Sequence, residues 1–282
     1  MKPLDAARRP GFPLRMPAAA KTAGATKIVA FNAREIGVTG LKHTSKEVRK
    51  PYSIATAGAA TITGAVGLGL DSQAVRTRMV QKLAAQGVTD SRVLAAMGLI
   101  ERHRFVDSAL VNQAYEDTSL PIGLGQTISK PNVVARMLEL LVKDCDGMLG
   151  RVLEIGTGCG YQAALLAQLA TEVYSIERLR GLHDRARDNL RPLRVANLHL
   201  LFGDGMAGYA RGAPYAAIIA AAGGEALPQS WLDQLAIGGR LVAPVQGANG
   251  AQALVLVNKT ARGITQTLLE AVHFVPLKSG TS

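Results

Sequence analysis

The sequence predicts an α/β fold with a mostly parallel, doubly wound sheet and an antiparallel edge at its C-terminal end. Short apolar runs alternate with amphipathic segments, and a glycine-rich turn follows the first such run. The last two runs follow each other without a helix between them. Such alternation indicates βαβ units, which pair their strands in parallel and place helices on both faces of the sheet.

The first 70 residues are expected to be a basic, disordered extension of a domain that spans residues 71–282. They hold eleven Lys or Arg residues against three acidic ones, which gives +8 of the chain's +11, and they show no sustained apolar period. The high overall charge is therefore weak evidence for a nucleic-acid partner. The uncharged stretch 53–70 is rich in Gly, Ala and Thr, which favours a linker over a membrane span.

Cysteine usage favours a reducing, cytoplasmic location. Cys145 and Cys159 are too few for a disulfide framework, and no histidine stands near them at metal-ligand spacing. We therefore expect no metal site.

Two short helices should open the domain, and a third should follow a loop. Val75, Met79 and Leu83 share one helical face, and a second face begins at Val93 behind a cap at Asp90. The polar, glycine-bearing run 116–129 is expected to be loop. A strong apolar stripe then predicts a helix whose first turn holds Pro131.

The remaining elements follow from the alternation. We expect parallel strands at 151–155, 172–176, 198–202, 215–220 and 240–245, and helices at 161–169, 179–190 and 228–235. The runs 253–257 and 267–274 should form the antiparallel edge.

The segment 152–162 is expected to bind a cofactor. Gly156, Gly158 and Gly160 let the backbone turn sharply at the point where an open parallel sheet binds nucleotide-like ligands. Glu154 stands just before them. A pyrophosphate would be repelled by this carboxylate, whereas a cationic sulfonium would be attracted, which favours S-adenosylmethionine over NAD.

Two further acids stand at strand ends. Glu177 could accept the hydroxyl groups of a ribose, and Asp204, beside Gly205, could accept an adenine amino group. The alternative for each is to cap the following helix.

From residue 71 to 277 the chain resembles the protein-L-isoaspartate O-methyltransferase family, which has a Rossmann-like S-adenosylmethionine-dependent methyltransferase fold. The matching stretches are residues 115–131 with Gly-Gln-Thr-Ile-Ser at 125–129, the glycine-rich turn, residues 176–178, 203–205, 234–239 and 274–277. The resemblance implies methylation of the free α-carboxylate of isoaspartyl residues in damaged proteins, followed by closure to a succinimide. Isoaspartyl peptides and proteins are then the partners, with a monomeric enzyme and no nucleic acid or membrane.

The resemblance also assigns residues. It implies that Ser129 holds the substrate carboxylate, and that the cofactor is bound by Gln126, Thr127, Ile128, Glu154, Gly156, Thr157, Gly158, Gly160, Tyr161, Gln162, Glu177, Asp204 and Gly205. A carboxylate is ionised at neutral pH, so the reaction needs alignment and exclusion of water rather than a general base. Ser129 could instead cap the helix after it. Residues 274–277 could line the peptide groove or pack in the core.

The chain departs from the family's pattern at three places, one of which is the turn 220–225, which lacks the usual Thr and prolines. Ala216 stands where the family usually has Asp, which bears on that wall of the site, and Lys130 replaces a residue that is commonly neutral. Lys130 could attract an anionic substrate or face solvent. The competing hypothesis is an S-adenosylmethionine-dependent nucleic-acid methyltransferase, but residues 220–227 lack the Asn/Asp-Pro-Pro-aromatic run typical of base-amino methylation.

Overall fold

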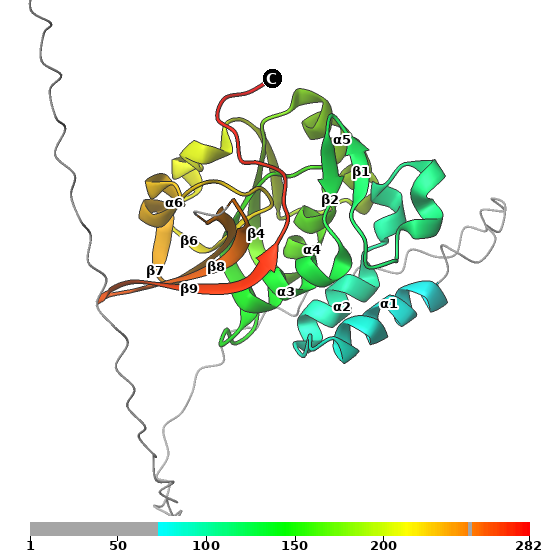
Figure 1. The fold of residues 1–282 in the computed structure, drawn as a ribbon, viewed down its shortest axis with the longest axis horizontal. Helices are drawn as coiled ribbons and strands as arrows, with labels where there is room; N and C mark the ends of the chain where they lie inside the picture. The colour runs from blue at the N-terminus through cyan, green and yellow to red at the C-terminus, as the bar shows by residue number, and fades with distance from the viewer. Residues whose placement is uncertain (1–72, 248–249) are drawn as a thin grey trace, which may run out of the picture. The chain divides into compact units, whose positions relative to one another are not determined.

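The structure, a computed structural model, describes residues 73–247 and 250–282 (Figure 1). Its main sheet has seven strands in the order β5-β4-β3-β6-β7-β8-β9. The strands are β3 (Leu149–Ile155), β4 (Ala170–Glu177), β5 (Leu198–Phe202), β6 (Tyr215–Ala220), β7 (Leu235–Gln246), β8 (Gln252–Thr260) and β9 (Gly263–Val272). Strands β3 to β7 pair in parallel, and β7, β8 and β9 pair antiparallel. Both predicted parts of the sheet are confirmed.

The strand order reverses at β3, which pairs with β4 on one side and with β6 on the other. In open α/β sheets, ligands bind outside the carboxyl ends of the strands at such a reversal. The glycine-rich turn leaves β3 at this point, so the topology places it where a cofactor is expected.

Helices cover both faces of the sheet. Side chains of α3 (Pro131–Val142), α4 (Tyr161–Leu169) and α5 (Arg180–Leu190) join one buried cluster, and α6 (Gln229–Gln234) contributes Trp231 to the other. Val152 and Leu153 on β3 belong to opposite clusters, because successive side chains of a strand point to opposite faces. Both layers are therefore packed on one rigid sheet.

Two further helices, α1 (Gln73–Ala85) and α2 (Ser91–Leu99), precede the sheet as expected. The Asp90 carboxylate accepts hydrogen bonds from the backbone amides of Arg92 and Val93, so it caps α2 as predicted. Met79 and Leu83 of α1 are buried.

The run 116–129 is not all loop, and this prediction was wrong. It contains an antiparallel hairpin of β1 (Leu120–Gly123) and β2 (Gln126–Ile128). The tip residues Gly123, Leu124 and Gly125 all have positive φ, at 88°, 51° and 69°, which two glycines accommodate easily. Leu120, Ile122 and Ile128 are buried, but three apolar positions among polar neighbours gave too short a period to predict strands.

The last predicted strand, 267–274, began four residues too late and ended two residues too late. β9 ends at Val272, and the backbone amide of Phe274 donates a hydrogen bond to Gln252 Oε1 at 2.7 Å instead of continuing the ladder. The predictions for residues 1–70 lie outside the described residues. Within the described part, no helix is long and apolar enough to cross a membrane.

Candidate active site

The glycine-rich turn has the backbone shape that its glycines predicted. Gly156, Gly158 and Gly160 have φ values of 89°, 57° and 92°, a region that other residues rarely adopt. A Cβ at Gly160 would also lie 2.8 Å from Leu190 Cδ1. The amides of Gly156 and Thr157 donate to the Ile176 carbonyl at 2.9 and 3.2 Å, which fastens the turn to the neighbouring strand.

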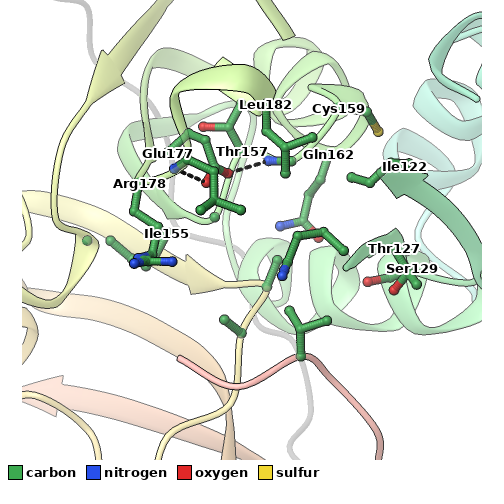
Figure 2. Close-up of a pocket in the computed structure, with 18 of the residues that line it drawn as sticks. Ile122, Thr127, Ser129, Ile155, Thr157, Cys159, Gln162, Glu177, Arg178 and Leu182 are labelled. Carbon is green, nitrogen blue, oxygen red and sulfur yellow. Dashed lines mark hydrogen bonds between the residues drawn. The ribbon is translucent and has the colours of Figure 1, made fainter. Parts of the chain in front are cut away.

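A cavity of about 260 Å³ lies over this turn, near the lower end of the size range of small-molecule sites (Figure 2). Its lining brings together eleven of the fourteen residues assigned from the sequence, from four separate parts of the chain. These are Gln126, Thr127, Ile128, Ser129, Gly156, Thr157, Gly158, Tyr161, Gln162, Glu177 and Gly205. Gly160, Glu154 and Asp204 are not part of the lining.

Glu177 lies at the end of β4 and is almost fully buried. Its Oε2 accepts a hydrogen bond from the Gly158 amide and its Oε1 accepts one from the Leu179 amide, both at 2.9 Å. Each carboxylate oxygen can accept a second bond, so ribose hydroxyls have acceptors facing the cavity. Leu179 is the N-cap residue of α5, so the Glu177 carboxylate also accepts a hydrogen bond at the N-terminus of this helix.

Asp204 caps the short helical turn that follows it, which was the alternative to a contact with adenine. Its Oδ1 accepts from the Met206 amide at 2.9 Å, and its Oδ2 accepts from the Gly280 amide at 2.7 Å. Its neighbour Gly205 does line the cavity, and a Cβ there would lie 2.6 Å from Ile155 Cγ2. Packing against Ile155 therefore requires glycine at position 205. The Asp204 carboxylate instead binds the backbone amides of Met206 and Gly280.

Glu154 lies behind the turn rather than in the cavity. It has no exposed surface, and its Oε2 accepts a 2.5 Å hydrogen bond from Ser175 Oγ, which in turn lies 2.6 Å from Thr157 Oγ1. Burial raises the pKa of the Glu154 carboxyl to about 8, against the lowering effect of the Ser175 hydrogen bond. The sequence predicted that Glu154 contacts a cationic cofactor directly, but its carboxyl does not line the cavity. It is linked to the cavity through Ser175 and Thr157.

The amino-acid end of S-adenosylmethionine fits the polar groups that remain. Gln162 lines the cavity, and its buried Nε2 donor has no partner within hydrogen-bond distance among the described residues, although the Gln162 amide is near enough to the Glu154 carboxyl to lower its pKa. An unpartnered buried donor is costly and suits a ligand carboxylate. The glycines beside it leave room for close approach of the ligand.

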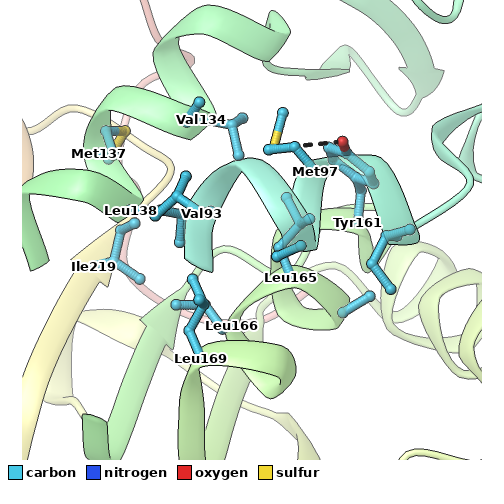
Figure 3. Packing of buried hydrophobic residues seen from close by; sticks show 14 of the residues in the cluster. Val93, Met97, Val134, Met137, Leu138, Tyr161, Leu165, Leu166, Leu169 and Ile219 are labelled. Carbon is cyan, nitrogen blue, oxygen red and sulfur yellow. Dashed lines mark hydrogen bonds between the residues drawn. The ribbon is translucent and has the colours of Figure 1, made fainter. Parts of the chain in front are cut away.

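Tyr161 begins α4 and anchors it in the core. Its ring packs edge-on against Phe105 at 5.5 Å between centroids, and its hydroxyl lies 3.8 Å from Met97 Sδ (Figure 3). The Arg102 guanidinium carbon stands 5.0 Å from the ring centroid. Tyr161 therefore fixes the turn-to-helix junction and also belongs to the cavity lining.

Ser129 follows the hairpin and is half-buried. The residue that flanks α3 is Lys130, and the side chain that accepts a hydrogen bond from the first turn is that of Asp117, whose Oδ1 accepts from the Asn132 amide at 2.9 Å. Ser129 therefore does not cap this helix. The Ser129 hydroxyl makes no hydrogen bond with any residue that the structure describes. It lies at the cavity edge beside Thr127 and is free to bind a ligand (Figure 2).

A second cavity, of about 520 Å³, meets the first at Ser129, which lines both. It lies between the start of α3 and the end of β9. Phe274 is 7% exposed and lines this second cavity, whereas Val275, Pro276 and Leu277 line the first. Of the two roles weighed for residues 274–277, core packing holds for Phe274, and a role in a peptide groove stays a prediction.

The C-terminal segment 275–282 lines the first cavity with residues 275–278, and its part beyond Leu277 carried no functional signal in the sequence. The Leu277 amide donates to the Gly223 carbonyl, and Arg178 Nε donates to the Gly280 carbonyl at 2.9 Å. The Ser282 amide donates to the Arg178 carbonyl. Ala216, in contrast, lies beside Gly150 at the opposite end of the strands and is not among the residues that line the cavity.

Comparison with known proteins gives consistent matches over the described domain. The family model for Protein-L-isoaspartate(D-aspartate) O-methyltransferase matches residues 74–282. The protein-L-isoaspartate O-methyltransferase of Methylibium petroleiphilum is 63% identical over 222 residues, covering 78% of this chain and 82% of that protein. That of Leptothrix cholodnii is 54% identical over 278 residues, covering 98% and 96%.

Solved structures agree. A protein-L-isoaspartate O-methyltransferase superposes with a TM-score of 0.66 at 28% identity, over 72% of this chain and 66% of that one. A putative protein-L-isoaspartate O-methyltransferase from Plasmodium falciparum, in complex with S-adenosyl-L-homocysteine, superposes with a TM-score of 0.64 at 24% identity, over 72% and 98%. The latter likeness supports the fold.

Proposed function

The chain belongs to the protein-L-isoaspartate(D-aspartate) O-methyltransferase family, and from this premise we propose how its own residues carry out the reaction. The enzyme uses S-adenosylmethionine to methylate the free α-carboxylate of L-isoaspartyl residues in damaged proteins. The methyl ester then closes to a succinimide, and hydrolysis of that ring returns part of the chain to normal aspartate. The observation that carries the proposal is Ser129, with a free hydroxyl between a cofactor-sized cavity and an open groove.

The cofactor is held by the turn and by the hairpin above it. When bound, S-adenosylmethionine supplies a methyl group on a positively charged sulfur. The Gly158 carbonyl, whose own amide donates to Glu177, and the Gln162 side chain are placed to hold its amino-acid end, and Glu177 to accept its ribose hydroxyls. Gln126, Thr127 and Ile128 cover it from the hairpin and keep water out.

Ser129 is the positioning group for the substrate. Its hydroxyl donates a hydrogen bond to one oxygen of the substrate carboxylate, so that the other oxygen lies in line with the methyl carbon. The nucleophile is already ionised at neutral pH, so no residue has to remove a proton. This explains why the cavity lining contains no histidine.

Peptide methylation with labelled S-adenosylmethionine tests this function. The enzyme is incubated with matched peptides that contain isoaspartate or normal aspartate at one position, and with total RNA. We expect base-labile label in the isoaspartyl peptide alone. Equal labelling of both peptides would contradict the substrate assignment, and label in RNA would favour the competing nucleic-acid methyltransferase hypothesis.

We further propose that the enzyme acts as a monomer in the cytoplasm, without a nucleic-acid or membrane partner, and that residues 1–70 are an extension dispensable for catalysis. The two cysteines, neither of which forms a disulfide, support the cytoplasmic location. A variant that begins at residue 71 should keep full activity on isoaspartyl peptides and elute as a monomer. Loss of peptide methylation on this truncation would show that the extension takes part in the reaction.

A further inference from the structure

The second cavity is a groove whose charge is set largely by one lysine. Its walls are the first turns of α3, with Lys130, Val133 and Arg136, and the end of β9, with Glu270 and His273. Leu254 and Phe274 contribute apolar surface. Because Ser129 belongs to both cavities, a substrate whose carboxylate reaches Ser129 has the cofactor on one side and this groove on the other.

The two cations of the groove differ in their partners. Arg136 lies between two acids, with Nη1 3.4 Å from Glu139 Oε2 and Nε 3.2 Å from Glu270 Oε1. Lys130 is exposed, and within residues 73–247 and 250–282 its side chain forms no ion pair or hydrogen bond. The positive charge of Arg136 is therefore largely compensated, whereas that of Lys130 is available to a ligand.

Resting on the proposed function, we infer that the groove binds the residues that flank the isoaspartate, and that Lys130 selects substrates with an acidic residue there. Neighbouring residues of an extended peptide lie about 3.3 Å apart along the chain. Lys130 follows Ser129 directly, and a lysine side chain is long and flexible. Its ammonium group can thus meet the side chain one or two residues from the isoaspartate.

The size of the preference follows from the exposure of the lysine. Ion pairs at exposed sites are worth little because water and salt screen them, which corresponds to about a two- to fivefold change in kcat/KM. The competing possibility is that Lys130 attracts the reactive carboxylate itself. In that case its removal would weaken all isoaspartyl peptides equally, since every substrate carries that carboxylate.

The test uses pairs of isoaspartyl peptides that differ only by Asp or Asn at one position next to the isoaspartate, on either side in turn. We expect the wild type to show a higher kcat/KM, by about two- to fivefold, for the acidic member of at least one pair at low salt. Lys130→Gln should bring that ratio to about one, and Lys130→Glu should reverse it. The matched control is Lys143→Gln, an exposed lysine at the other end of the same helix, which should keep the wild-type ratio.

The outcomes separate this inference from the proposed function. If isoaspartyl peptides are methylated without any flank preference, or if Lys130→Gln retains the preference, the inference is wrong and the function stands. An equal loss on every peptide would assign Lys130 to the reactive carboxylate and would also overturn it. If the wild type methylates none of the isoaspartyl peptides, the proposed function fails first. Unchanged melting temperatures of the variants exclude misfolding as the cause.

Discussion

The floor and the cover of the cofactor cavity are held in different ways. The floor is the turn 156–162 with Glu177 and Gly205, and the cover is the hairpin 120–128 with the segment 275–282. The floor is fastened to buried strands by backbone hydrogen bonds and tight glycine packing. The cover is tied down by contacts between residues far apart in the chain, such as Arg185 Nη1 on the Ile122 carbonyl at 2.7 Å and the Leu277 amide on the Gly223 carbonyl. Changes in the floor should therefore affect stability and binding together, and changes in the cover should affect mainly binding or catalysis.

The largest effect should come from a glycine of the floor. Gly160→Ala combines a positive φ with a Cβ placed 2.8 Å from Leu190 Cδ1, so we expect a loss of about 2–5 kcal/mol in the free energy of unfolding. Gly125→Ala in the cover also has a positive φ, but no atom lies within 4 Å of its Cβ, and about 1 kcal/mol is expected. Urea denaturation compares the two, and equal losses would contradict the distinction between floor and cover.

The second prediction concerns the buried acid beneath the floor. With a pKa near 8, Glu154 stays protonated in the folded protein where the unfolded chain, with its ordinary value of 4.5, has lost the proton. The stability of the wild type relative to Glu154→Gln should therefore fall as pH rises from about 5 to about 8, by on the order of a few kcal/mol. Unfolding midpoints of both proteins across this range test the point. Parallel pH profiles would mean that Glu154 is ionised when folded.

The third prediction concerns catalysis at the edge of the cover. Ser129→Ala removes one hydrogen bond to a charged carboxylate, so kcat/KM on isoaspartyl peptides should fall by about ten- to a hundredfold. Its melting temperature should not change, because Ser129 does not cap α3. Full turnover with reduced stability would instead restore the capping interpretation.

The smallest effect should come from the tie between floor and cover. Asp204→Asn weakens the acceptor of the Gly280 amide while leaving a side-chain oxygen for Met206, and should cost about 1 kcal/mol or less. We expect the Kd of S-adenosylhomocysteine to rise a few-fold, measured by calorimetry, and the Gly280 amide to exchange faster with deuterium. An unchanged Kd together with unchanged exchange would show that the C-terminal segment is not held through Asp204.

The same division explains what could be predicted from the sequence. Glycine spacing and strand periodicity are local signals, so the turn, the seven strands and the position of Glu177 followed from them. The cover depends on contacts between residues far apart in the chain, such as Gly280 with Asp204, which leave no local pattern. Glu154 shows the limit most clearly. Its place in the sequence indicated a cofactor contact, but its position in β3 turns the side chain toward Ser175 and the core.

The most direct test of the account follows repair itself. A synthetic isoaspartyl peptide is incubated with the enzyme and S-adenosylmethionine, and the methyl ester, the succinimide and the normal aspartyl peptide are separated by chromatography over time. We predict that the normal peptide accumulates only when enzyme and S-adenosylmethionine are both present, and more slowly with Ser129→Ala. An isoaspartyl peptide that remains unchanged in the complete mixture would contradict the account.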